Sequence, residues 1–152
     1  MIDLDTLFDV IDRHELWIKG RPGGERAVFI GMDLSHAVFR GHNLSQAVFC
    51  DSDLRSAKLL DCCCIYAYFR NARLSGADIV NCNFACADLT SATFGGGALI
   101  AASDFELAIA RNANFLNTCI YRSDFHGTDL TGAKYDSKLI FQHPAAQKGG
   151  IA

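Results

Sequence analysis

This sequence of 152 residues lacks the features by which membrane, secreted and nucleic-acid-binding chains are usually recognised. No apolar run approaches the ~20 residues of a membrane span. Its start, Met1-Ile2-Asp3-Leu4-Asp5, has neither the basic segment nor the long apolar segment of a signal peptide. The 14 Lys and Arg residues form no run and the net charge is -3, whereas phosphate binding needs clustered positive charge. We therefore expect a cytoplasmic protein that contacts no membrane and binds no nucleic acid directly.

Signs of a disulfide framework are also missing. The seven cysteines are odd in number and accompany no export signal, so they are expected to be free thiols in a reducing compartment. Half of the residues are apolar, which gives a chain of this length enough material for one continuous core. These properties predict one folded domain and exclude a disordered chain.

A repeat of five residues runs through most of the chain. Small residues recur at every fifth position, and a bulky apolar residue follows each of them by two. The small positions are Ala27, Met32, Ala37, His42, Ala47, Ser52, Ala57, Cys62, Ala67, Ala72, Ala77, Cys82, Ala87 and Ala92, followed after one six-residue step by Ala98, Ser103, Ala108, Ala113, Thr118, Ser123, Thr128 and Ala133. The bulky positions begin with Phe29, Leu34, Phe39, Leu44 and Phe49 and continue to Tyr135.

Neither a helix of period 3.6 nor a strand of period 2 keeps every fifth residue on one side, so the chain must turn as it advances. If each pentapeptide forms one side of a square, four of them close a coil, and the repeat makes about 5.5 coils stacked at roughly 4.8 Å. The small residue then faces inward near a corner and the bulky residue fills the middle. Gly95-Gly96-Gly97 supplies the six-residue step, which predicts a bulge at one corner.

Several of these pentads resemble one known family. Ala77-Asp78-Ile79, Ala87-Asp88-Leu89, Ala113-Asn114-Phe115 and Thr128-Asp129-Leu130-Thr131-Gly132-Ala133 are similar to the Ala-(Asp/Asn)-Leu-X-X consensus of the pentapeptide-repeat proteins. The resemblance covers about 110 residues of the chain. It implies an all-β solenoid, a right-handed quadrilateral β-helix; the hand of the helix is taken from the resemblance alone.

The two ends of the chain lie outside the repeat. In residues 1–26, Leu4, Leu7, Phe8 and Ile11 recur at helical spacing, and Gly20 begins a segment that stops a helix. We expect an N-terminal α-helix that covers the first coil, the alternative being a helix that docks a partner. The expected organisation is a helical cap and linker at 1–26, a β-helix at 27–137, and a cap and tail at 138–152, with Tyr135 and Phe141 closing the last coil.

No set of residues predicts catalysis or a cofactor. His42, Cys62 and Cys82 fall in one inward column, but stacked residues lie in a line, whereas zinc needs four converging ligands. In Cys62-Cys63-Cys64 only Cys63 points outward, and no histidine partners it. The histidines at 14, 36, 126 and 143 are read as surface or cap residues. We therefore expect no enzyme activity, no metal and no cofactor.

Function is then expected on the outward residues. The candidate protein-interaction surface is rimmed by Arg40, Arg70, Arg111 and Arg122. The period of five places Val48, Tyr68 and Ile109 on one side of the coil, Leu60 and Val80 on another, and Ile65, Tyr66 and Leu107 on the side and corner between them. This surface would bind an unidentified protein or a second copy of the chain. Some proteins of the resembled family imitate DNA and occupy a type II topoisomerase, gyrase, which makes such mimicry an alternative. A secreted bacterial effector is a further alternative.

Residues 27–137 carry 11 acidic and 8 basic side chains, a net charge of -3. Mixed charge of this size is an ordinary solubilising surface rather than the dense negative surface of a DNA mimic.

Overall fold

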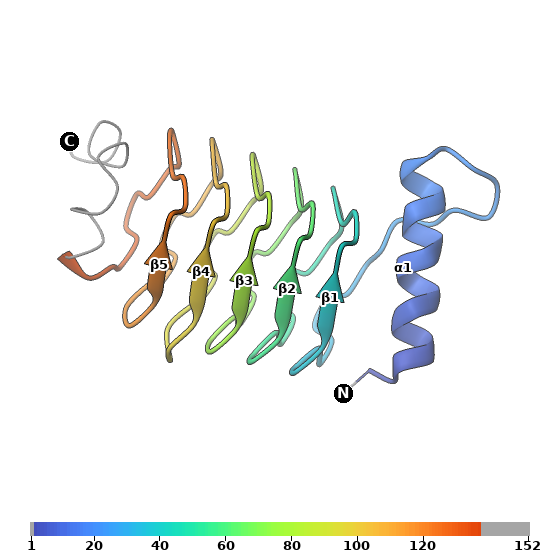
Figure 1. The fold of residues 1–152 in the computed structure, drawn as a ribbon, viewed down its shortest axis with the longest axis horizontal. Helices are drawn as coiled ribbons and strands as arrows, with labels where there is room; N and C mark the ends of the chain where they lie inside the picture. The colour runs from blue at the N-terminus through green and yellow to red at the C-terminus, as the bar shows by residue number, and fades with distance from the viewer. Residues whose placement is uncertain (1, 138–152) are drawn as a thin grey trace.

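The computed structural model describes residues 2–137 and contains one helix followed by a parallel sheet that winds as a solenoid (Figure 1). The elements are α1 (Leu4–Ile18), β1 (Val38–Arg40), β2 (Lys58–Leu60), β3 (Asp78–Val80), β4 (Leu99–Ala101) and β5 (Cys119–Tyr121). The five strands follow one another in chain order across one sheet, all parallel. Helix α1 lies across the end of the solenoid beside β1 (Figure 1). Among the described residues, no helix is long and apolar enough to cross a membrane.

Each coil has four sides, and equivalent sides pair in register. Phe39 pairs with Leu59 and Leu59 with Ile79, steps of 20 residues, whereas Ile79 pairs with Ile100, a step of 21. The other three sides pair through single bridges, such as Val28 with Val48 and Ile109 with Asp129. The right-handed quadrilateral β-helix is confirmed. Regular strands account for about four turns, slightly fewer than the 5.5 predicted coils, because the outermost levels pair only through such bridges.

The extra residue is absorbed at the glycine step. Gly96 and Gly97 have φ values of 72° and 83°, in the left-handed region that glycine enters without steric cost. A Cβ at Gly95 would lie 2.9 Å from the carbonyl oxygen of Leu116. The bulge therefore depends on these glycines both for backbone conformation and for close approach to the next coil.

The Asp and Asn residues of the repeat hold the corners. The carboxylate of Asp88 accepts hydrogen bonds from the Thr90 amide at 3.0 Å and the Thr90 hydroxyl at 2.6 Å. Asp129 does the same for Thr131, and Asp104 accepts the Glu106 amide at 2.8 Å. A short acceptor two residues before a backbone N–H stabilises a tight turn. The outward second position of the pentad thus favours Asp or Asn because the chain turns there.

Stacked phenylalanines fill the interior. The Phe49 ring lies 4.9 Å from that of Phe29 and 4.6 Å from that of Phe69, measured between ring centroids. Phe84 and Phe105 stack at 4.8 Å in a second column. All of these rings are fully buried, in agreement with their predicted inward positions. Phe49 is packed by its equivalents above and below, so each coil stabilises its neighbours.

Helix α1 begins at the N-cap Asp3, whose side chain accepts the Thr6 amide at 2.9 Å. Leu7, Ile11 and His14 form its buried face against the first coil. The predicted helix is present, but its buried face is narrower than the spacing suggested, because Leu4 and Phe8 stay exposed. His14, read as a surface or cap residue, is fully buried within this cap.

Two residues that the repeat places inward, both in the first coils, are not fully buried. Met32 is 41% exposed because its side chain is too long for a position that accommodates alanine in later coils. His42 is half-buried, and its Nδ1 lies 3.3 Å from Glu15 Oε1 of α1. At the other end Tyr135 packs partly buried against the core, whereas Phe141 and the predicted cap and tail at 138–152 lie outside the described residues.

Candidate interaction surfaces

One side of the solenoid, which we call the Tyr68 face, carries a column of four apolar side chains and two aspartates. The column consists of Val28, Val48, Tyr68, Asp88, Ile109 and Asp129, each paired with the next. Tyr68 is 41% exposed and Ile109 is 40% exposed. Because the backbone groups beneath these side chains are paired between coils, the face offers side chains for contact and little free backbone.

The adjoining corner adds two larger exposed residues to this face. Tyr66 and Leu107 are each 57% exposed, and both hold left-handed backbone conformations, with φ values of 58° and 57°. The equivalent residue one coil beyond Leu107 is Gly127, which adopts this conformation freely. Ile65 precedes Tyr66 and is half-buried. The left-handed conformation recurs at this corner in every coil, at Gln46, Tyr66, Cys86, Leu107 and Gly127, so it is a regular feature of the solenoid and not particular to the two large residues.

Arginines border the Tyr68 face, and their guanidinium groups lie close to the Tyr68 ring and to the carboxylates of this face. The guanidinium of Arg26 lies 5.1 Å from the ring centroid of Tyr68. Arg70 pairs with Asp88 at 3.2 Å, and Arg111 pairs with Asp129. The Thr131 hydroxyl, Arg111 and the Thr131 amide together lower the pKa of Asp129 to about 2.

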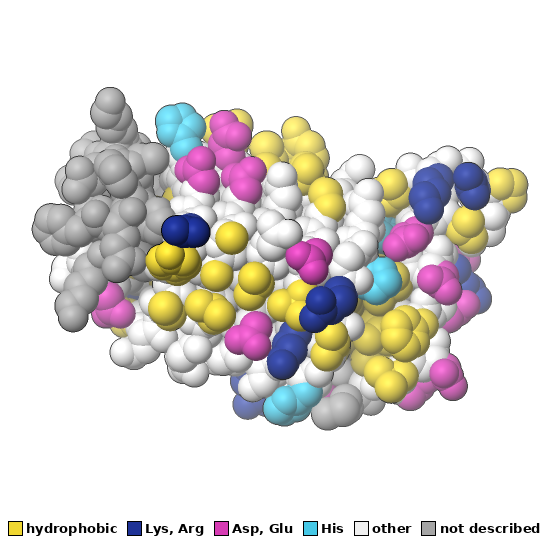
Figure 2. Space-filling model, in the orientation of Figure 1, with side chains coloured by type: hydrophobic (Ala, Val, Ile, Leu, Met, Phe, Trp, Pro, Cys, Tyr) yellow, Lys and Arg dark blue, Asp and Glu magenta, His cyan; other side chains and the backbone are white. Residues whose placement is uncertain are grey.

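The opposite side, which we call the sheet face, is formed by β1 to β5 and carries a second apolar strip (Figure 2). Leu60 and Val80 are half-buried there, and strand register continues their column through Ala101 to Tyr121, which is 55% exposed. Leu99 and Cys119 lie beside this column on β4 and β5. The guanidinium of Arg122 lies 5.1 Å from the Tyr121 ring centroid.

The structure thus divides the predicted surface between two faces. It brings Val48, Ile65, Tyr66, Tyr68, Leu107 and Ile109 together on the Tyr68 face and its corner, and it places Leu60 and Val80 on the sheet face. The side between them presents Asn43, Cys63, Asn83, Asp104 and Asp124. The prediction missed Leu99, Ala101 and Tyr121, although continuing the register beyond the glycine step would have placed them beside Val80.

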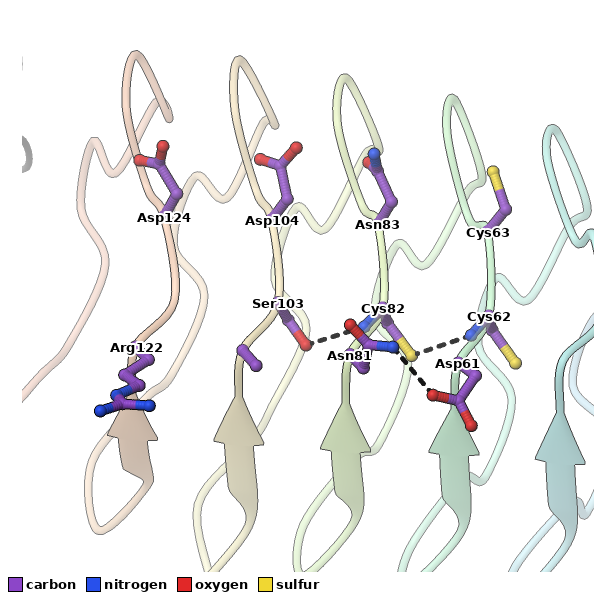
Figure 3. Close-up of a pocket in the computed structure, with 11 residues that line it drawn as sticks. Asp61, Cys62, Cys63, Asn81, Cys82, Asn83, Ser103, Asp104, Arg122 and Asp124 are labelled. Atoms are coloured by element: carbon purple, nitrogen blue, oxygen red, sulfur yellow. Dashed lines mark hydrogen bonds between the residues drawn. The ribbon is translucent and has the colours of Figure 1, made fainter.

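A polar groove of about 560 Å³ crosses the corner between the sheet face and this polar side (Figure 3). Its lining includes Asp61, Cys62, Cys82, Asp104 and Arg122. Within residues 2–137, no group of three or more His, Cys, Asp or Glu side chains is placed to hold a metal ion. The seven cysteines, all of them described, are free thiols.

The repeat, the four-sided coil and the Asp turns define a class of protein, the pentapeptide-repeat β-helices. The family model described as pentapeptide repeats matches residues 33–63, 62–99 and 101–134, with eight copies. This match spans more than half of the chain, so the protein belongs to the pentapeptide-repeat family. No match was found among curated proteins.

Solved structures of the family show the same fold. A pentapeptide-repeat protein, Rfr23, from the cyanobacterium Cyanothece 51142 is 16% identical, with a TM-score of 0.70 over 86% of this chain and 96% of that one. HetL, a pentapeptide-repeat protein involved in heterocyst differentiation regulation in the cyanobacterium Nostoc sp. strain PCC 7120, is 22% identical, with a TM-score of 0.59 over 72% of this chain. The match spans only 56% of HetL. These likenesses concern the fold.

QnrB1, a plasmid-mediated fluoroquinolone resistance protein, also matches, with 20% identity over 80% of this chain and 73% of that one. Its TM-score of 0.31 is too low to indicate a shared shape along the length of the two molecules.

Proposed function

We propose that this chain is a non-enzymatic protein-interaction module that binds a partner protein, or a second copy of itself, through the Tyr68 face. The observation that carries the proposal is the column of Val28, Val48 and Tyr68, with Ile109 beyond Asp88 and with Tyr66 and Leu107 at the adjoining corner. An exposed apolar column with tyrosines and arginines has the composition of a protein contact, since those residue types most often anchor interfaces.

The exposed side chains at the corner support the same proposal. Tyr66 and Leu107 occupy left-handed conformations that glycine occupies at the equivalent Gly127. Gln46 and Cys86 hold the same conformation in this column, so it is the exposed apolar area of Tyr66 and Leu107, each 57% exposed, that supports a contact outside the solenoid. Leu107 also covers Gly127, where an added Cβ would lie 2.7 Å from Leu107 Cδ2.

The absence of enzyme activity is part of this proposal. Of the four described histidines, His14 and His42 are engaged between α1 and the first coils, and His36 and His126 lie exposed on different corners. A nucleophile needs a base within hydrogen-bond reach, and these positions supply none for the thiol of Cys63, which contacts the Ser45 hydroxyl at 3.1 Å.

Charge pairing disfavours the alternative of a DNA mimic. Asp53 is paired with Arg55 and Arg73, and basic residues also pair with Asp61, Asp78, Asp88 and Asp129. Neutralised carboxylates do not project the unbroken negative field of a phosphate backbone. A gyrase supercoiling assay separates the two functions, because the interaction module leaves supercoiling unchanged whereas a mimic inhibits it in proportion to dose.

The proposal is tested with the double variant Tyr66→Glu/Tyr68→Glu. A partner bound to this face would bury the two introduced negative charges, so we expect at least a 100-fold loss of affinity for the bound protein. Partners are captured from the native host with the wild-type chain, identified by mass spectrometry and then measured individually, while sedimentation velocity follows self-association.

Tyr121→Glu is the matched control, since Tyr121 is a similarly exposed tyrosine on the opposite face. It should leave both the affinity and the oligomeric state unchanged. If the double variant keeps every partner and the same oligomeric state, the Tyr68 face is not the binding surface.

A further inference from the structure

The first coil has an uncovered strand edge at the end of the Tyr68 face nearest α1. The Val48 amide donates to the Ala27 carbonyl oxygen at 3.0 Å, and the Val48 carbonyl oxygen accepts the Phe29 amide at 2.7 Å. In a parallel bridge of this kind the N–H and C=O of the intervening Val28 point away from the second coil, toward the end of the solenoid that carries α1 (Figure 1). Neither group of Val28 has a hydrogen-bond partner within residues 2–137. Val28 therefore presents a free backbone donor and a free backbone acceptor.

On the next side of the same coil the chain covers the equivalent edge itself. Asp33 bridges to Asp53 there as Val28 bridges to Val48. The Asp33 carbonyl oxygen accepts the Ile2 amide at 2.9 Å, so the N-terminal residues add to that side as a preceding level would. Among residues 2–137 none adds to Val28 in this way. The place of a preceding level is thus filled on one side of the coil and open on the other.

A groove lies at the open place, between α1 and the first coil, and we call it the cap groove. Its volume is about 330 Å³, and it is lined by Asp9, Val10, Arg13, Glu25, Arg26 and Val28. Its walls are held together, because the Glu25 amide donates to the Arg13 carbonyl oxygen at 3.1 Å and the Ala27 amide to His14 Nδ1 at 3.1 Å. Since α1 forms one wall, the cap groove admits a single extended chain and not the flat end of a second solenoid.

The charged side chains of the cap groove are already engaged. Arg13 pairs with Asp9 at 3.1 Å and with Glu25 at 3.4 Å. The Nε of Arg26 donates to the Gln46 carbonyl oxygen at 2.6 Å, which directs this arginine toward the second coil and away from the groove. Two arginines and two carboxylates leave no net charge among the lining residues. The cap groove therefore complements an uncharged segment, which it can hold by backbone hydrogen bonds and apolar contact.

We propose that the cap groove binds an uncharged, extended segment of another protein, which adds to the first coil as a β-strand through the backbone of Val28. In strand addition the main-chain hydrogen bonds supply affinity and alternate side chains supply specificity. The residue opposite Val28 faces outward and continues the column of the Tyr68 face. Its two neighbours face inward, where Leu7 and Ile11 of α1 already fill the interior, so they must be small. The segment thus reads small, large apolar, small.

The probe is a phage-displayed library of short linear peptides selected on the full chain, from which the tightest binders are synthesised. We expect them to share the pattern small, large apolar, small. Amide hydrogen exchange followed by NMR then reports on the edge itself, and bound peptide should slow the exchange of the Val28 amide at least about tenfold. The Phe29 amide is the matched control, since it is already bonded to Val48 and should not change. A selection in which no peptide slows exchange at Val28 overturns the proposal.

Two variants test the edge by affinity, measured as fluorescence anisotropy of the labelled peptide. Val28→Pro removes the donor without breaking a hydrogen bond of the folded chain, and it should weaken binding about tenfold. Val28→Ala keeps the N–H and should weaken binding much less. Melting temperatures verify that both variants fold. Equal affinities of the two folded variants would show that the peptide does not pair with Val28, which overturns the proposal.

A second pair of variants avoids any change to the edge. Val10→Trp fills the cap groove from α1 and should abolish peptide binding, whereas Asp12→Trp places the same ring on the exposed part of the helix and should not. Peptide binding that survives in Val10→Trp would locate the site elsewhere and overturn the proposal. Tyr66→Glu/Tyr68→Glu leaves the groove lining intact and should bind the peptide normally, so the cap groove and the Tyr68 face are tested separately.

Discussion

The coils and the helical cap are held together in different ways. In the inner coils of the solenoid a buried ring or alanine is packed by the equivalent residues one coil above and one coil below, as Phe49 is by Phe29 and Phe69. Helix α1 rests on the first coil through Leu7, Ile11 and His14, and it has a partner on one side only. A change inside the coils therefore disturbs three levels at once, whereas a change in the cap can be confined to its docking.

The largest expected effect comes from breaking the small inward column. Ala87 is fully buried, and the pairs of Tyr68 with Asp88 and Asp88 with Ile109 place Ala67 and Ala108 at the neighbouring levels. A tryptophan at this position cannot be relieved by moving one coil, because the coil spacing is fixed at ~4.8 Å on both sides. We expect Ala87→Trp to abolish folding, measured as loss of the native circular dichroism spectrum and of a cooperative melting transition.

Ile109→Trp is the matched control for this prediction. It places the same ring one coil further and one residue along, but outward, where Ile109 is 40% exposed. It should melt within a few degrees of the unmodified chain. A native spectrum and an unchanged melting temperature in Ala87→Trp would show that the column has room for a large ring, against the predicted register.

A smaller effect is expected from removing one ring of the stack. Phe49 contacts Phe29 and Phe69 face to face and Phe39 edge to face, at 5.9 Å between centroids. Phe49→Ala leaves a cavity that three coils line, and we expect a loss of about 3–5 kcal/mol in the free energy of unfolding by urea. Tyr68→Ala, outward on the same side of the next coil, should cost less than about 1 kcal/mol. Equal losses in the two variants would contradict the stacked core.

The same contrast explains what the sequence could predict. Because the coil positions repeat every five residues, one assignment of inward and outward positions was enough to predict Phe49, Phe69 and Ala87 as buried and to locate the glycine step. Each of these positions is determined by the equivalent residues in neighbouring coils. The cap does not repeat, and its helical spacing indicated that Phe8 would be buried, whereas His14 is buried instead. Nothing in a one-helix pattern indicates that an imidazole will accept the amide of Ala27, since that amide lies 13 residues away in the chain.

The candidate surface was predictable to a similar extent. The period of five placed Tyr66, Tyr68, Leu107 and Ile109 outward and close together, because they lie near one corner of neighbouring coils. It also placed Leu60 and Val80 on another side of the coil, which the strand register of the structure identifies as the sheet face. Ten residues along the chain amount to two sides, and therefore to the opposite face.

The smallest expected effect lies in the cap, where His14 makes docking sensitive to acid. Its Nδ1 accepts the Ala27 amide at 3.1 Å, and its ring stacks on Trp17 at 5.5 Å. Its Nε2 is buried and has no hydrogen-bond partner within residues 2–137. Burial lowers its pKa below the ordinary 6.5; among nearby groups the Ser45 backbone and Glu15 oppose this shift, and Arg26 adds to it. Because the docked cap binds fewer protons than the free helix, docking is fully stable above pH 6.5 and weakens below it, at most about tenfold per pH unit.

Amide exchange in residues 4–18 measures this prediction when intrinsic exchange rates are corrected for pH. Exchange should accelerate between pH 6.5 and 5 in the cap, while the amides of β3 remain protected. His14→Asn is the informative variant, because its Oδ1 can accept the Ala27 amide without titrating, and it should remove the acceleration. His42→Gln controls for the neighbouring contact between His42 and Glu15. An acceleration that persists in His14→Asn would assign the acid sensitivity to another group and leave the cap docked by Leu7 and Ile11 alone.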